Sequence, residues 1–186
     1  MVSLGSLWLP IILSAVFVFV VSSIIHMVLK YHNRDYSPLP NEDAVRAAIR
    51  AGKPRPAQYI LPYCQEMKQM QSPEMQQKYT EGPVAVLNLM RSGPPRMGPA
   101  LVQWFVYSLV VSFFIAYIAA HSILPNTRYL EVFRIVGAVG FLAYAAGQVP
   151  QAIWMGKPWS IAWKEVIDGL VYGLVTAGTF GWLWPR

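Results

Sequence analysis

Long apolar stretches alternate with polar connections along the 186 residues of the chain. A helix that crosses a bilayer needs about 20 largely apolar residues, and four stretches meet this length: residues 7–29, 98–121, 130–154 and 166–184. The chain is 55% hydrophobic and only 13% charged, whereas soluble domains carry roughly twice that share of charge. The sequence therefore predicts an all-α integral membrane protein with four transmembrane helices.

The long connection between the first two stretches is predicted to form a small α+β segment. Asn41 is a typical N-cap for a helix over residues 42–51, whose apolar positions have helical spacing. Ser72 as N-cap, followed by Pro73, is typical of the start of a second helix. Two apolar runs bounded by proline and glycine are typical of paired strands, at residues 59–61 and 84–90. The predicted limits of the three parts of the chain are 1–29, 30–97 and 98–186.

The basic residues are concentrated in two of the connections. Ten of the fifteen Lys and Arg residues lie between Lys30 and Arg96, and Lys157 and Lys164 lie between the third and fourth stretches. Basic residues accumulate in the cytoplasmic connections of membrane proteins. We therefore expect residues 30–97 in the cytoplasm and both termini outside. The net charge of +6 then follows from topology, so the expected partner is the lipid bilayer and not nucleic acid.

Motifs for catalysis are absent from the sequence. Cys64 is the only cysteine, so no intrachain disulfide can form. There is no P-loop, dinucleotide-binding glycine motif, zinc-protease motif or nucleophile elbow. Asp168 is expected at the start of the fourth stretch, where an acidic residue favours the helix dipole. We therefore predict no enzymatic activity and no bound cofactor.

Small residues recur at helical spacing in the last two stretches. In the fourth they are Gly169, Gly173, Ala177 and Gly181. In the third they are Gly140, Ala143 and Gly147. Spacing of three or four places them on one side of a helix, and small residues let two helix backbones approach closely in lipid. The pattern predicts a packing seam between these two helices, with a ligand groove as the weaker alternative.

Two ligand sites stay open beside ordinary structural roles. Cys64 precedes Met67, Met70 and Met75, and such soft ligands select Cu(I), although methionine is also an adaptable apolar contact. His26 lies near the inner end of the first stretch, where it could ligate a pigment or haem. A histidine at that depth is also a common interfacial residue.

Several sequence segments carry a resemblance to a known family. They read SSIIHM at the end of the first stretch, PNEDAV, SPEMQQK followed by GPV, and DGLVYGLVTAGTFGWLWP. Together they resemble an uncharacterised family of small four-span bacterial inner-membrane proteins with no assigned activity. The resemblance implies a bacterial inner-membrane location and four spans, and it implies no role for any residue.

Three hypotheses for the function follow from these patterns. The leading one is a non-catalytic accessory or scaffold subunit of a larger membrane complex, of respiratory or photosynthetic type, with other membrane-protein subunits as partners. The second is a small protein that handles Cu(I) or a solute. The third is a pigment or haem binder that uses His26.

Overall fold

The computed structural model describes all residues, 1–186, and the chain divides into two compact units. The helical unit comprises Met1–Asp35 and Arg96–Arg186, and the connecting unit is Tyr36–Pro95. The division falls after Asp35, whereas the sequence predicts it after Leu29. The difference arises because the residues that follow the first predicted span form a short helix whose side chains bond to the helical unit.

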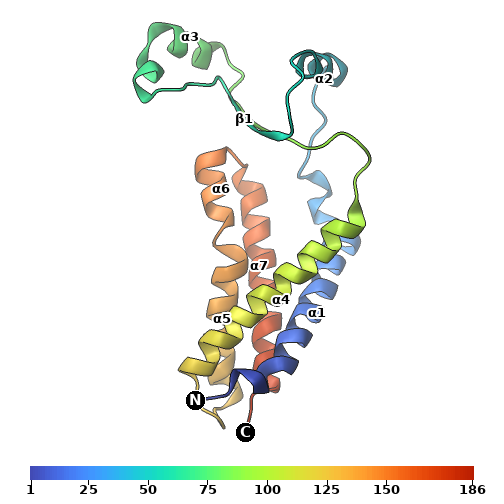
Figure 1. The fold of residues 1–186 in the computed structure, drawn as a ribbon, viewed down its shortest axis with the longest axis vertical. Helices are drawn as coiled ribbons and strands as arrows, with labels where there is room; N and C mark the ends of the chain where they lie inside the picture. Colours follow the sequence, from blue (N-terminus) through green and yellow to red (C-terminus); the bar gives the residue numbers. More distant parts are fainter. The chain divides into compact units, whose positions relative to one another are not determined.

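The helical unit contains α1, α4, α5, α6 and α7 (Figure 1). Their bounds are α1 Trp8–Ser23, α4 Met97–Ser122, α5 Tyr129–Ala145, α6 Gln148–Met155 and α7 Trp159–Trp182. Short helical turns flank α1: the 3-10 turns η1 (Leu4–Leu7) and η3 (Tyr31–Arg34), and the π-helical turn η2 (Ile24–Val28). Both termini lie at the same end of this unit (Figure 1).

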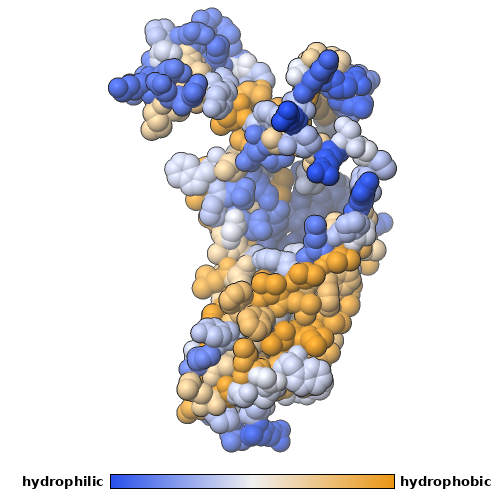
Figure 2. All heavy atoms as spheres, viewed as in Figure 1, coloured by the Kyte–Doolittle hydropathy of each residue, from blue (hydrophilic) through white to orange (hydrophobic).

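Three helical runs are long and apolar enough to cross a membrane: Leu4–Val28, Met97–Ser122 and Tyr129–Met155. Their outward side chains are apolar as well, and Figure 2 shows hydrophobic residues covering much of the visible face of the helical unit. On α4, for example, Val102 and Phe114 are exposed. An apolar surface of this extent marks a membrane or protein contact. Length and surface together are those of a multi-pass membrane protein.

The helix α7 differs from these three runs. Its first half carries Lys164, Glu165 and Asp168, and it is not among the runs apolar enough to span. The sequence places the start of the fourth stretch at residue 166, but α7 already begins at Trp159, because no proline or glycine interrupts the residues before 166. Asp168 therefore lies inside the helix and is buried. The prediction that it stabilises the first turn is wrong.

The third predicted stretch, residues 130–154, is divided into two helices. α5 ends at Ala145 and α6 begins at Gln148. Pro150 explains the division, because proline has no N–H to donate to the carbonyl of Ala146 one turn earlier. Ala146 and Gly147 between the two helices keep helical dihedral angles, so α6 continues the run of α5 toward the polar end of the unit.

α5 and α7 pack antiparallel along a seam of small residues. A Cβ on Gly140 would lie 3.0 Å from the Cα of Gly173, and a Cβ on Gly169 would lie 2.8 Å from Ala145. The other two small residues of α7 also face α5, Ala177 at Gly137 and Gly181 at the ring of Tyr129. The two backbones thus approach closely where glycine leaves room.

On α5 the seam differs from the prediction at two positions. Ala143 and Gly147 are both exposed, and a Cβ on Gly147 would meet nothing within 4 Å. Gly147 lies beyond the end of α5, where the helix is interrupted. Ala145, which is buried, packs against α7 in their place.

The connecting unit contains one antiparallel strand pair and two short helices. β1 (Ala57–Leu61) pairs with β2 (Ala85–Leu89), with Tyr59 opposite Leu87, which confirms the predicted strand pair. The helices are α2 (Glu42–Ala51) and α3 (Pro73–Glu81), preceded by the 3-10 turn η4 (Met67–Gln71).

The two predicted helix caps of this unit have different outcomes. The hydroxyl of Ser72 accepts a hydrogen bond from the backbone N–H of Met75 at 3.3 Å, as predicted. Asn41 adopts a left-handed conformation, with φ 54°, and its side chain caps nothing. Met75 is the only buried apolar side chain of the unit, so the unit has almost no core of its own.

Candidate functional site

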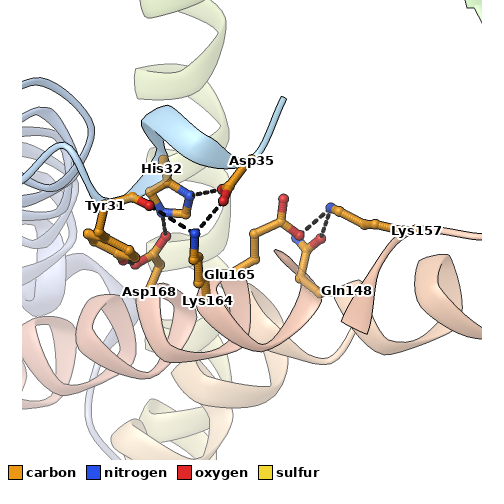
Figure 3. Close-up of polar contacts among 8 residues, drawn as sticks. All are labelled: Tyr31, His32, Asp35, Gln148, Lys157, Lys164, Glu165 and Asp168. Carbon is orange, nitrogen blue, oxygen red and sulfur yellow. Dashed lines mark hydrogen bonds and ion pairs between the residues drawn. The ribbon is translucent and has the colours of Figure 1, made fainter. Parts of the chain in front are cut away.

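Polar side chains gather where the residues after α1 meet α7 (Figure 3). This is the end of the helical unit away from the two termini (Figure 1). The π-helical turn η2 and the left-handed Lys30, with φ 55°, end the first helical run. η3 then brings Tyr31 and His32 against α7. π-helical turns and left-handed non-glycine residues are frequent at functional sites. Their presence here is consistent with a site at this end of the unit.

His32 lies between two carboxylates (Figure 3). Its Nδ1 is 2.5 Å from Asp35 Oδ2, and its Nε2 is 2.8 Å from Asp168 Oδ2. Both carboxylate side chains are only 5% exposed. A neutral imidazole can donate from one nitrogen only. If Nδ1–H donates to Asp35, the contact of Nε2 with ionised Asp168 therefore requires a proton or another cation between the two atoms.

Tyr31 and Lys164 complete this group, which we call the His32 cluster: Tyr31, His32, Asp35, Lys164 and Asp168. The Tyr31 hydroxyl donates to Asp168 Oδ1, and Lys164 Nζ donates to Asp35 and, at 2.8 Å, to the Tyr31 carbonyl. Burial raises the pKa of the Asp35 carboxyl, but hydrogen bonds from Lys164 and His32 outweigh it, so the pKa lies below its usual value. Asp35 is thus ionised at neutral pH opposite Lys164.

A second ion pair lies beside the cluster. Lys157 donates to Glu165 and also approaches the side-chain oxygen of Gln148 at 3.4 Å (Figure 3). Lys157 and Lys164 therefore each neutralise one carboxylate. Asp168 is left without a Lys or Arg partner, although it is the carboxylate that lies inside a helix and is buried.

A cleft of about 560 Å³ opens next to the cluster within the helical unit. Asp168, Glu165 and His26 form part of its wall. The remaining polar and aromatic wall residues come from α4, α5, α6 and α7: Gln103, Trp104, Tyr107, Tyr144, Gln148 and Tyr172. Acidic, amide and aromatic side chains thus converge on one space.

The four aromatic side chains of the cleft touch one another in a closed ring. Trp104 contacts Tyr107 and Tyr172, and Tyr144 contacts the same two tyrosines, with centroid distances between 5.5 and 6.1 Å. Edge-on and offset contacts at these distances are favourable. The aromatic wall is therefore held in place by its own packing.

Two hydroxyl groups in this wall have no partner. Trp104 donates to the hydroxyl of Ser22 at 2.9 Å, and Tyr107 donates to the carbonyl of Ala143 at 3.3 Å. The hydroxyls of Tyr144 and Tyr172 make no hydrogen bond, although these residues are only 7% and 5% exposed. A buried hydroxyl without a partner costs about 1–3 kcal/mol. Both residues line the cleft, although the hydroxyl oxygens themselves are buried. An occupant that a small rotation of either ring brings within hydrogen-bond distance would relieve this cost.

The structure brings the predicted residue His26 to the edge of this site. His26 is exposed on η2 and lines the cleft, and its ring centroid is 4.6 Å from that of His32. A ring nitrogen of His26, one of His32 and a carboxylate oxygen of Asp168 all lie within 4.8 Å of one another. Ligation of a pigment or haem by His26 stays a prediction.

The predicted copper ligands lie in the connecting unit. The Cys64 thiol donates to the carbonyl of Glu66 at 3.0 Å. Met67 and Met70 are exposed on η4, whereas Met75 is buried in α3. The four sulfur-bearing side chains thus differ widely in their exposure, and copper binding stays a prediction.

No sequence motif predicted a site at His32, Asp35 and Lys164, the residues at the centre of the cluster. A usable signal was present, because the predicted topology places residues 30–35 and residues 157–168 at the same edge of the membrane. A histidine, acids and a lysine gathered at one edge predict a polar network there. The exact partners still depend on the turn at Lys30, which no sequence pattern announces.

Comparison of the chain with protein families, curated proteins and solved structures finds no match in any of the three. The resemblance to a four-span bacterial family stays a prediction. The chemistry of the His32 cluster and of the cleft is the guide to function.

Proposed function

We propose that the protein is a four-span bacterial inner-membrane protein whose cleft binds a small, planar carbonyl compound of the quinone class. One observation carries the proposal: the unpartnered hydroxyls of Tyr144 and Tyr172 in the aromatic wall of the cleft. Such hydroxyls donate to carbonyl oxygens, and aromatic rings stack on a planar conjugated ligand.

The fourth span and its orientation are part of this proposal. α7 packs antiparallel along the whole length of α5, from Tyr129 to Ala145. Both termini lie at one end of the helical unit (Figure 1), and an even number of membrane crossings requires this. The excess of basic residues in 30–97 favours the cytoplasm for the connecting unit. The cleft then opens at the cytoplasmic edge of the bilayer, at a depth that lipid-soluble quinones reach.

Thiol labelling tests the topology. Cys64 is expected to react with a membrane-impermeant maleimide in inverted membrane vesicles and not in intact spheroplasts. A Ser3→Cys variant in a Cys64→Ser background is the matched control, and it should label in spheroplasts. Labelling of Cys64 in sealed spheroplasts would overturn the proposed orientation.

Equilibrium dialysis with a short-chain ubiquinone analogue tests the ligand. The detergent-solubilised full-length protein should bind one equivalent saturably. The Tyr144→Phe/Tyr172→Phe double variant should bind roughly 30-fold more weakly, because two lost hydrogen bonds of about 1 kcal/mol each amount to about 2 kcal/mol. Neither hydroxyl makes a hydrogen bond of good geometry, although the hydroxyls of Ser108, Ser112 and Thr176 lie near that of Tyr144. The double variant should therefore fold without ligand, with a free energy of unfolding within about 1 kcal/mol of the wild type.

Tyr117→Phe provides the control for this comparison. Tyr117 lies on α4 and is exposed, with its ring beside His121, so its hydroxyl is remote from the proposed contacts. Its loss should leave quinone binding unchanged. Equal binding by the wild type and the double variant would contradict the proposal, since partitioning into detergent would then explain all of the signal.

A second candidate function, the accessory subunit, is favoured by the connecting unit. This unit buries a single apolar side chain, Met75, while Leu39, Ile60 and Val84 are exposed. A segment with so little core gains stability from a partner. Purification in mild detergent from native membranes should recover a stoichiometric second protein, and migration of the chain alone would count against this candidate.

A further inference from the structure

We infer that His26, His32 and Asp168 bind one divalent transition metal ion at the mouth of the cleft, whether or not the cleft holds an organic ligand. The three side chains offer two imidazole nitrogens and one carboxylate oxygen within 4.8 Å of one another. They come from three segments, η2, η3 and α7. No such group was expected from the sequence, because His32 and Asp168 are 136 residues apart.

The distances suit a metal ion with little rearrangement. Ligand atoms on a tetrahedral ion with bonds of about 2.0–2.2 Å lie roughly 3.3 Å apart. His32 Nε2 and Asp168 Oδ2 are 2.8 Å apart, so they need only a small separation. His26 would have to approach by at most about 1.5 Å from the 4.8 Å limit. Its ring makes no hydrogen bond in the structure, so it is free to turn.

The neighbours of the ligands are arranged as the supporting partners of a metal site usually are. A metal-binding histidine commonly donates its second ring N–H to a carboxylate, which fixes the ring and its tautomer. Asp35 stands in this position at Nδ1 of His32, and Lys164 holds Asp35 in turn. The Tyr31 hydroxyl donates a hydrogen bond to Oδ1 of Asp168, which leaves Oδ2 to face His32.

Charge also favours a cation at this point. Asp35 and Glu165 are neutralised by Lys164 and Lys157, whereas Asp168 has no basic partner except His32. With Asp35 accepting from Nδ1, the lone pair of Nε2 faces the carboxylate oxygen of Asp168. A divalent ion between the two atoms satisfies both as ligands. The competing arrangement is an imidazolium, in which a proton takes that place.

The donor set indicates the class of the ion. Imidazole nitrogen suits zinc, iron, nickel and copper, and a single carboxylate with two histidines is common for zinc and for non-haem iron. Three protein ligands leave at least one position of the ion open. His26 and Asp168 both line the cleft, so that this open position would face a ligand bound there.

Isothermal titration of the metal-depleted, detergent-solubilised full chain with Zn²⁺, without a polyhistidine tag, tests the inference. The wild type should bind one Zn²⁺ per chain, and His26→Ala should weaken binding at least 10-fold. Asp35→Asn leaves all three ligands in place and should weaken binding by about 10- to 100-fold, as loss of a supporting carboxylate typically does. Absorption of the Co²⁺-loaded protein in the visible range should report histidine and carboxylate ligation and should be lost in His26→Ala.

His121→Ala is the matched control, because His121 is exposed on α4 and contacts only the Tyr117 carbonyl of its own helix. It should bind Zn²⁺ as the wild type does. The fold of His26→Ala should persist, since no hydrogen bond is lost. If the wild type bound Zn²⁺ no more tightly than His26→Ala, the cluster would be an imidazolium between two carboxylates and the inference would be wrong. Quinone is absent from this titration, so its result is separate from that of the quinone experiment.

Discussion

The two halves of α7 are stabilised in opposite ways. The second half meets α5 through small residues, with Gly173 against the backbone of Gly140 and Phe141, and its interactions are contacts between close backbones. The first half carries Lys164, Glu165 and Asp168, whose partners are charged or hydroxyl groups of η3 and of the loop before α7. One helix thus joins a lipid-type packing seam to a buried polar network.

The proposed ligand sites belong to the polar half of α7. A packing seam satisfies itself, since small residues gain dispersion contacts and leave no group unpaired. The polar half leaves Asp168 without a Lys or Arg partner and lies beside two unpaired tyrosine hydroxyls. Buried polar groups without partners are uncommon in native proteins, and a bound ion or ligand is one explanation for them. Substitutions in the two halves should therefore fail for different reasons.

The largest effect is expected in the seam. A Cβ on Gly173 would lie 2.7 Å from the backbone nitrogen of Phe141, and backbone cannot move aside as a side chain can. Gly173→Leu should therefore yield no folded protein. Gly173→Ala should lower the free energy of unfolding by about 1–3 kcal/mol, the usual cost of overpacking. Circular dichroism during SDS titration of mixed micelles measures both variants.

Gly178→Ala is the control on the same helix. A Cβ at Gly178 would meet only the Tyr129 hydroxyl at 3.7 Å, an ordinary contact. Its unfolding should match that of the wild type. If Gly173→Ala were equally harmless, α5 and α7 would not be joined by the close seam seen in the structure.

The next largest effect is expected in the polar half. Asp168→Ala in metal-free protein leaves the Tyr31 hydroxyl and His32 Nε2 without their partner in a nearly buried site. Breaking a buried pair from one side costs about 3–5 kcal/mol. The same SDS titration, with EDTA present, measures the loss.

Asp43→Ala sets the scale for that loss. Asp43 pairs with Arg46 at 3.4 Å, but its side chain is almost fully exposed. Its removal should leave unfolding unchanged, because water screens the pair. An Asp168→Ala variant as stable as Asp43→Ala would show that the His32 cluster contributes nothing to the fold.

The seam could be predicted from the sequence more fully than the cluster. Spacing of four on α7 is a local property of one helix, so Gly169, Gly173, Ala177 and Gly181 could be placed on one face without knowing the partner. The partner positions on α5 were less certain, because Pro150 interrupts the helix and removes Gly147 from it. The strand pair and both short helices followed in the same way from local apolar spacing and turn residues, although Asn41 does not cap α2.

The cluster depends on contacts between residues more than 120 positions apart. His32 lies outside every apolar stretch, and only the left-handed turn at Lys30 brings it back against α7. The apolar pattern places Asp168 at the start of the fourth stretch, but α7 begins at Trp159, so Asp168 lies inside the helix. Local periodicity indicates neither the turn at Lys30 nor the start of α7 at Trp159. The cluster therefore follows only from the tertiary structure.

The smallest effect is expected for the removal of one lysine from an ion pair, either with buried Asp35 or with exposed Glu74. Lys164→Gln removes the partner of Asp35, whose side chain is 5% exposed, and should lower the free energy of unfolding by about 1–3 kcal/mol. Lys78→Gln removes the partner of Glu74 on the surface of α3, where Lys78 lowers the pKa of Glu74. That pair is solvated and screened by salt, so its loss should cause no measurable change in unfolding. Equal effects of the two substitutions would contradict the claim that burial of Asp35 makes its ion pair with Lys164 more stabilising than an exposed ion pair.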